Sequence, residues 1–249
     1  MVIKYGGNAM TDAATRQRAA AALYDATAGG EPPVVVHGGG PFIQAALDAA
    51  GLEHRFERGL RVTTEESLDV IESVLTLLGK QLAQEIGPAV GLTGRDAGLL
   101  HAAQRAGLGR VGRMTRVEPH VIGALRAAGL VPVVACLAVG EDGGLLNVNA
   151  DEVAGAVAGA LSEGVVFLTN VPGVLEHPDR PHSLISELTR SEALERLADG
   201  RIAGGMIPKV EAALAALDHG APFAVVADGR DPEGVARALA GGGTRVTAG

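Results

Sequence analysis

Short apolar runs alternate with longer amphipathic stretches along most of the chain, and this alternation constrains the fold more than any other feature. The apolar runs, which have the length and the Val, Ile and Leu content of buried strands, are Met1–Tyr5, Val34–His37, Ala89–Leu92, Leu130–Val139, Val165–Asn170 and Phe223–Ala227. Buried strands joined by helices favour a largely parallel sheet with right-handed crossovers. We therefore expect an α/β fold.

The helices expected between these strands follow from amphipathic patterns and capping residues. Thr64 is expected to cap the longest helix, over Glu65–Ile86, and Thr11 or Asp12 to cap a helix that ends near Ala28. The other expected helices are Phe42–Ala50, Val121–Ala128, one ending near Leu161, Ser191–Leu197, Val210–Asp218 and Pro232–Leu239. A hairpin is expected before Met114, and a short edge strand at the end of the chain.

Composition narrows the class of protein. The 249 residues are 47% apolar but only 2% aromatic, so a substantial core must be built from Ala, Val, Leu and Ile. A net charge of −8 argues against nucleic acid or an anionic membrane as the main partner. The single cysteine, Cys136, excludes an intrachain disulfide and fits a reducing compartment. No apolar run reaches the roughly 18–20 residues of a spanning helix and no secretory signal is recognised, so we expect a soluble cytoplasmic protein.

A glycine triple, Gly38–Gly40, follows the second expected strand and precedes a helix. This arrangement suits anion binding, because backbone N–H groups can converge on an oxyanion without an intervening Cβ atom. It is not a dinucleotide fingerprint, since the third glycine would fall at Ile43, and the chain contains no P-loop motif. The alternative is a simple tight turn, and His37 is interpreted as structural.

The segment from Leu146 to Glu152 places two of the four asparagines of the chain, Asn147 and Asn149, just before an apolar helix. Asn149 could cap this helix, with Glu152 as the reciprocal partner of a capping box. The helix N-terminus would then direct free N–H groups toward a ligand. The alternative is ordinary turn and cap chemistry.

Lysine is rare in this chain, and its positions are informative. The only lysines are Lys4, Lys80 and Lys209; every other basic residue apart from histidine is arginine. Lys4 and Lys209 lie beside glycine pairs, where a ligand can approach the backbone closely, and a compact ammonium group suits a phosphoryl group. Lys80 is interpreted as a surface residue.

Three further side chains are candidates for ligand contacts. Arg61 offers a guanidinium fork that suits a carboxylate, although a surface ion pair is the alternative. Thr169 and Asn170 follow a buried strand at its carboxyl end, where α/β sheets bind ligands. They are therefore candidate nucleotide contacts, with a plain strand-end turn as the alternative.

Six motifs, in order along the chain, resemble those of the amino acid kinase family. They are Lys4–Met10, Val35–Pro41, Gly59–Thr63, Asn147–Asp151, Leu168–Val174 and Gly204–Val210. The resemblance implies a three-layer αβα sandwich around an open, mainly parallel sheet. It also implies a single domain with an N-terminal substrate lobe over about 1–163 and a C-terminal nucleotide lobe over about 164–249.

The activity that the resemblance implies is ATP-dependent phosphorylation of N-acetyl-L-glutamate on its γ-carboxylate, a step in arginine biosynthesis. Mg²⁺ would be bound through the nucleotide and not by protein ligands. The residues that the resemblance assigns to catalysis are Lys4, Lys209 and Asp151, with Asp151 holding both lysines. Those assigned to the substrate are Gly39, Gly40, Arg61, Asn147 and Asn149, and those assigned to the nucleotide are Gly6, Gly7, Thr169, Asn170, Gly205 and Met206.

Other functions stay open at this stage. The nearest alternative is a related kinase that phosphorylates aminoadipate or glutamate attached to a carrier protein. A dinucleotide-dependent oxidoreductase and a non-catalytic sensor are more distant alternatives. Because arginine-sensitive relatives carry an additional N-terminal helix that builds a hexamer, and this chain starts at its first strand, we expect a homodimer without strong arginine feedback.

Overall fold

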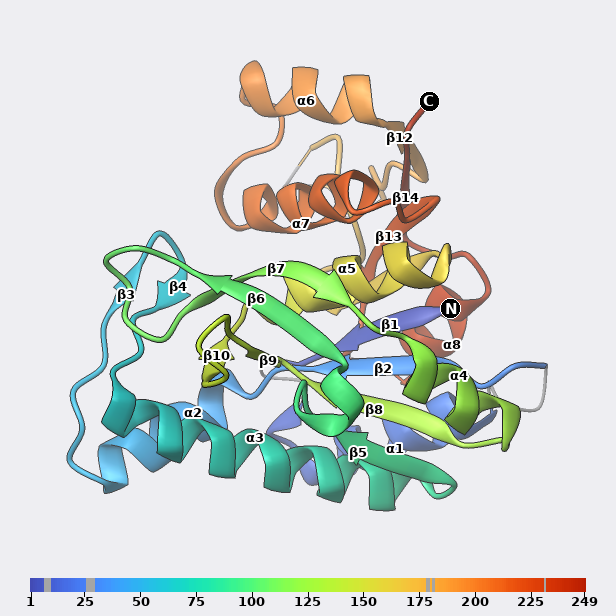
Figure 1. The fold of residues 1–249 in the computed structure, drawn as a ribbon. Helices are drawn as coiled ribbons and strands as arrows, with labels where there is room; N and C mark the ends of the chain where they lie inside the picture. Colours follow the sequence, from blue (N-terminus) through green and yellow to red (C-terminus); the bar gives the residue numbers. More distant parts are fainter. Residues whose placement is uncertain (7–9, 26–29, 178–179, 181, 231) are drawn as a thin grey trace.

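One mixed sheet of eight strands runs through the centre of the computed structural model, which describes residues 1–6, 10–25, 30–177, 180, 182–230 and 232–249 (Figure 1). In spatial order the strands are β12 (Glu187–Thr189), β14 (Thr244–Thr247), β13 (Phe223–Asp228), β11 (Val165–Thr169), β1 (Val2–Tyr5), β2 (Val34–His37), β8 (Val131–Ala135) and β5 (Ala89–Leu92). All neighbours from β13 to β5 pair in parallel. The expected α/β fold with a mainly parallel sheet is confirmed.

Alternating side chains of the central strands point to opposite faces of the sheet and build two cores. Val2 and Val34 belong to one core, and Ile3 and Val35 to the other. Helices cover both faces: α5 (Ala150–Leu161) and α7 (Ile207–Asp218) pack on one, and α1 (Ala13–Asp25), α3 (Glu65–Ile86) and α8 (Pro232–Leu239) on the other (Figure 1). The result is a three-layer αβα sandwich.

Shorter elements surround this sandwich. A four-stranded sheet has the order β10 (Leu145–Asn147), β9 (Leu137–Val139), β6 (Leu100–Gln104) and β7 (Gly112–Val117), and β3 (Phe56–Glu57) pairs with β4 (Leu60–Arg61). The remaining helices are α2 (Gly40–Ala49), α4 (His120–Ala127) and α6 (Arg190–Ala198), with short 3₁₀ turns at Asp96–Gly98 and Gly204–Met206. Among the described residues, none of the helices is both long and apolar enough to cross a membrane.

Two predictions about strands were wrong. The apolar run Leu130–Val139 is not one strand, because the chain leaves the large sheet at Cys136 and continues as β9 in the small sheet. The terminal strand β14 is not at the edge either: it pairs antiparallel with β13 and is covered by β12, a strand of three residues that the sequence pattern did not predict. Cys136 is buried as expected, and burial raises the pKa of its thiol to about 12.

The predicted helix caps were largely confirmed. Thr64 and Ser67 form a reciprocal capping box at the start of α3. The side chain of Asn149 caps α5, but Glu152 does not complete a capping box. Its carboxylate instead accepts hydrogen bonds from the Met114 backbone N–H at 2.8 Å and from Arg105 at 3.0 Å, which ties α5 to the β6–β7 hairpin.

Helix α7 starts three residues earlier than expected, and the end of α1 cannot be compared with its prediction. Helix α7 begins at Ile207, so Lys209 lies in its first turn and not in the preceding loop. Helix α1 is described as far as Asp25, and the predicted end near Ala28 lies outside the described residues.

Candidate functional site

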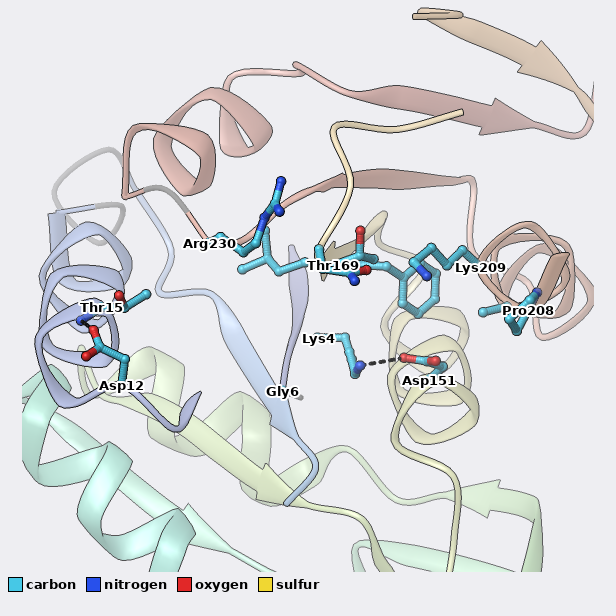
Figure 2. A pocket seen from close by; sticks show the side chains of 13 residues that line it. Lys4, Gly6, Asp12, Thr15, Asp151, Thr169, Pro208, Lys209 and Arg230 are labelled. Atoms are coloured by element: carbon cyan, nitrogen blue, oxygen red, sulfur yellow. Dashed lines mark hydrogen bonds and ion pairs between the residues drawn. The ribbon is translucent and has the colours of Figure 1, made fainter. Parts of the chain in front are cut away.

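A cavity of about 640 Å³ opens at the carboxyl ends of β1, β11 and β13, three neighbouring strands in the middle of the large sheet (Figure 2). Its lining residues come from five of the surrounding elements and their adjoining loops. They are Lys4, Gly6, Asp12, Thr15, Asp151, Phe167, Leu168, Thr169, Asn170, Pro208, Lys209, Ala212 and Arg230. Both of the lysines that the sequence singled out therefore line a single cavity.

Lys4 and Asp151 form an ion pair inside this cavity. The Lys4 ammonium extends from β1 to the first turn of α5, where its Nζ lies 3.0 Å from Asp151 Oδ1 (Figure 2). The side chains are 17% and 34% exposed, so water screens this pair only in part. Asp151 Oδ1 is buried and accepts no well-directed hydrogen bond from the described residues, so Lys4 is its main electrostatic partner.

Lys209 approaches the cavity from the other side, on the first turn of α7 (Figure 2). Its Nζ donates to the Gly205 carbonyl oxygen at 2.9 Å, and within the described part of the chain no carboxylate lies within 4.0 Å of it. Among the described residues, Asp151 therefore pairs with Lys4 and not with Lys209, and no described carboxylate neutralises the Lys209 charge. A neutral carbonyl is easily exchanged for an anion as partner.

Glycines let the ends of β1 and β2 approach α5 closely. A Cβ atom on Gly6 would lie 3.4 Å from the Gly38 nitrogen, and one on Gly38 would lie 3.3 Å from the Ala150 Cβ. A Cβ atom on Gly39 would lie 2.8 Å from Leu75, so this glycine allows α2 to pack on α3. Gly38 thus lies beside the first residue of α5 and next to the end of β1.

Arg61 is a buried cation with no direct anionic partner in the described part of the chain. It is only 9% exposed, and its guanidinium donates to two neutral acceptors, the carbonyl oxygen of Gly40 and Gln44 Oε1, each at 3.4 Å. The Phe56 ring covers it at 4.6 Å, and no described carboxylate lies within 4.0 Å. Burial lowers the pKa of this guanidinium. Because a buried charge is costly unless it is paired, this arrangement indicates an anion site.

Asn147 is oriented by a short chain of hydrogen bonds. The buried Thr63 hydroxyl donates to the Arg61 carbonyl oxygen at 2.9 Å and accepts from Asn147 Nδ2 at 3.2 Å. Since the amide nitrogen of Asn147 faces Thr63, its Oδ1 remains as an acceptor without a partner among the described residues. Arg61 and Asn147, which are far apart in sequence, are thus linked through one side chain.

Other predicted site residues have structural partners of their own. The side-chain Oδ1 of Asn149 accepts from the Asp151 and Glu152 backbone N–H groups, so its side-chain Nδ2 is the group left to donate to a ligand. The Thr169 hydroxyl is engaged with the backbone of Val171 and Ala227, as the strand-end turn alternative anticipated.

Of the remaining predicted site residues, some line the cavity and others do not. Asn170 lines the cavity, whereas Gly205 and Met206 form the 3₁₀ turn before α7 and are not lining residues. Gly40 begins α2, away from the cavity lining, and Gly7 lies outside the described residues. His37 and Lys80 behave as expected: His37 is fully buried, and Lys80 is exposed and donates to the Gly91 carbonyl oxygen.

Three polar side chains that line the cavity, those of Asp12, Thr15 and Arg230, were not predicted as site residues. Asp12, which immediately precedes α1, and Thr15, in its first turn, reach the cavity, and Asp12 accepts a hydrogen bond from the Thr15 N–H at 2.6 Å. Arg230 follows β13 and is held by Asp228 through hydrogen bonds of 3.0 and 2.7 Å. The rule that ligands lie beyond the carboxyl ends of strands would have found Arg230, because it follows β13 as Thr169 ends β11.

The fold and this cationic cavity define a class of proteins that handle phosphoryl groups, and a model of the amino acid kinase family matches residues 1–228. The chain belongs to the amino acid kinase family. It is 55% identical over 248 residues to the acetylglutamate kinase of Deinococcus radiodurans, covering 99% of both chains. It is 44% identical to the acetylglutamate kinase of Gluconobacter oxydans, covering 100% of this chain and 91% of the relative.

Among solved structures, the crystal structure of smu.665 from Streptococcus mutans UA159 has a similar fold. The TM-score is 0.80 at 27% sequence identity, over 100% of this chain and 98% of the other. The expected amino acid kinase fold is thereby confirmed.

Proposed function

We propose that this chain transfers the γ-phosphoryl group of ATP to the γ-carboxylate of N-acetyl-L-glutamate, giving N-acetyl-L-glutamyl 5-phosphate and ADP in arginine biosynthesis. The family and the names of the two relatives support this activity. The structural observation that carries it is the cavity in which the paired Lys4 and the unpaired Lys209 approach from opposite sides.

Transfer of a phosphoryl group to a carboxylate requires mainly the neutralisation of negative charge. A carboxylate oxygen forms a bond to the γ-phosphorus while the bond to the β,γ-bridging oxygen breaks, so no proton has to be moved and no general base is needed. Two anions must approach each other, and each unit charge pair at about 4 Å counts for roughly 4 kcal/mol at an effective dielectric near 20. Lys4 and Lys209 would offset this repulsion, and Asp151 would hold Lys4 in place.

Mg²⁺ would reach the site with the nucleotide phosphates. Within the described residues no group of three or more His, Cys, Asp or Glu side chains could hold a metal ion, and Asp151 is already paired with Lys4. This donor set fits an ion that is coordinated chiefly by phosphate and water. When bound, the ion would neutralise part of the charge on the transferring group.

The acceptor amino acid would be held by Arg61 and Asn147, which are not among the residues that line the cavity. The buried Arg61, which has only neutral acceptors at 3.4 Å, would bind the α-carboxylate, and the free Oδ1 of Asn147 would accept from the acetamido N–H. Both residues belong to the proposed substrate lobe of residues 1–163. Thr169, Asn170 and Lys209 belong to the nucleotide lobe of residues 164–249.

An ATP-dependent hydroxamate assay across N-acetylglutamate, glutamate, aspartate and aminoadipate tests this function. We expect turnover with N-acetylglutamate well above the others, because only this compound presents both a free α-carboxylate and an acetamido group. Arg61→Gln should raise the KM for N-acetylglutamate and leave the KM for ATP unchanged. Absence of ADP release with N-acetylglutamate, or a preference for carrier-linked aminoadipate, would refute the proposal.

The assembly and location of the protein are also proposed here. We infer a cytoplasmic homodimer, in which the exposed Leu77 on α3 is one apolar side chain that a partner could cover. Light scattering on the purified chain is expected to give the mass of a dimer, and a hexamer would overturn this inference.

A further inference from the structure

Arg61 raises a question that the proposed activity leaves open, namely what holds a buried guanidinium in place while its charge stays unpaired. The side chain that reaches it is Gln44, half-buried on the exposed side of α2, whose Oε1 accepts from Arg61 Nη1 at 3.4 Å. On the other side, Gln44 Nε2 donates to both carboxylate oxygens of Asp48, at 3.3 and 3.2 Å. Gln44 therefore stands between a cation and an anion.

The orientation of the Gln44 amide follows from its two neighbours. A guanidinium can only donate hydrogen bonds and a carboxylate can only accept them, so Oε1 must face Arg61 and Nε2 must face Asp48. Gln44 and Asp48 are four residues apart on α2 and lie on the same face of the helix. The His54 side chain contacts both Gln44 and Asp48, and its Nε2 lies 3.1 Å from Asp48 Oδ1.

A neutral amide in this position has a consequence for Arg61. Asp48 attracts the guanidinium only across the length of Gln44, and its side chain is 60% exposed, so water screens its charge. Arg61 is thus oriented by neutral acceptors, and none of the described carboxylates hydrogen-bonds to its guanidinium. A glutamate in place of Gln44 would set a carboxylate directly against Nη1 and form the bidentate pair that an incoming carboxylate would otherwise form.

We propose that Gln44 is a positioning residue that orients Arg61 without neutralising it, and thereby sets the affinity of the enzyme for the anionic end of its acceptor substrate. This inference rests on the proposed function, in which Arg61 binds the α-carboxylate of N-acetylglutamate. It concerns ground-state binding of one substrate, so it predicts an effect on one KM and not on the chemical step.

The test is steady-state kinetics of Gln44→Glu with both substrates varied. The KM for N-acetylglutamate should rise by about tenfold or more, because the new carboxylate competes for Arg61, while kcat and the KM for ATP stay within about twofold. Gln44→Met keeps the length of the side chain and removes its polar atoms, so it should raise the same KM by only about threefold. Gln17→Glu, on the exposed face of α1, makes the same change in charge and should alter neither KM.

The outcomes separate this inference from the proposed function. If Arg61→Gln leaves the KM for N-acetylglutamate unchanged, the proposed role of Arg61 is wrong. If Arg61→Gln raises this KM but Gln44→Glu does not, or if Gln44→Glu lowers kcat at unchanged KM, Gln44 does not act as proposed. Should Gln44→Glu fail to fold by circular dichroism, Gln44→Met decides: an unchanged KM rejects the inference and a selective rise supports it.

Discussion

The ion pair between Lys4 and Asp151 makes a sharp prediction about non-additive mutations. If Asp151 serves catalysis by holding Lys4, then Asp151→Asn should be costly in the native enzyme and nearly neutral once Lys4 is gone. The relevant comparison is a cycle of four proteins: the native chain, Lys4→Ala, Asp151→Asn and the double variant.

The expected magnitudes follow from the geometry of the pair. Lys4 Nζ and Asp151 Oδ1 are 3.0 Å apart, but the Asp151 side chain is 34% exposed. The interaction energy of the pair is therefore well below the value for two charges in a low-dielectric interior. Lys4→Ala removes a preorganised donor to the transferring group and should raise the barrier by about 3 kcal/mol. Asp151→Asn keeps the Lys4 ammonium but removes the carboxylate that positions it. This should raise the activation free energy by about 2 kcal/mol, which corresponds to a roughly thirtyfold lower kcat. In the Lys4→Ala background the same substitution should change kcat by less than about threefold.

The direction of the change in the KM for ATP is an independent test of the same electrostatic reasoning. Asp151→Asn removes a negative charge from a cavity that receives a polyanion, so the KM for ATP should stay the same or fall. ADP release at saturating concentrations of both substrates gives kcat, and thermal melting shows that all four proteins are folded. Equal fold losses from Asp151→Asn in both backgrounds would refute the coupling, and a raised KM for ATP would refute the electrostatic reasoning.

Three other predictions concern separate parts of the molecule. Lys209→Ala should lower kcat by about a hundredfold with little change in stability, since its described hydrogen bond is a local one to Gly205; a near-normal kcat would contradict its role. Arg230→Gln should raise the KM for ATP several-fold, and less so at high salt, because Arg230 adds an exposed charge to the cavity; an unchanged KM at low salt would exclude a nucleotide contact. Burial lowers the pKa of His37 from 6.5 to about 4, so protonation favours the unfolded chain. Stability should therefore fall as the pH drops from 6.5 towards 4, by about 3 kcal/mol from this residue, and His37→Gln should flatten that slope in urea titrations at several pH values; an identical slope would show that His37 is not buried in its neutral form.

The fold could be predicted well where local sequence determines it. The amphipathic stripe and the Thr64 cap predicted α3 with the bounds that the structure shows. The order of β14 and β12 could not be predicted, because strand pairing depends on contacts between distant segments. The division of the apolar run Leu130–Val139 into two strands at Cys136 could not be predicted either, because apolar residues continue on both sides of Cys136.

The candidate site shows the same division. Lys4 and Lys209 were identified by the scarcity of lysine, and the structure brings both to one cavity. Arg61, Thr169 and Asn170 were candidates from the residue pattern, and the other substrate and nucleotide assignments came from the family resemblance. All of them stay predictions, and the Thr169 hydroxyl hydrogen-bonds to the backbone of the turn that follows β11. Asp12 was missed because a capping residue has no spacing pattern of its own, whereas the strand-end rule could have identified Arg230, which follows β13.

A crystal structure with a non-hydrolysable ATP analogue, Mg²⁺ and N-acetylglutamate would show whether both lysines act on the transferring phosphoryl group. We expect Lys4 Nζ and Lys209 Nζ both to lie within hydrogen-bonding distance of the γ-phosphate, with Lys209 released from the Gly205 carbonyl oxygen and Lys4 still beside Asp151. A complex in which either ammonium group stays remote from the phosphate chain would contradict it.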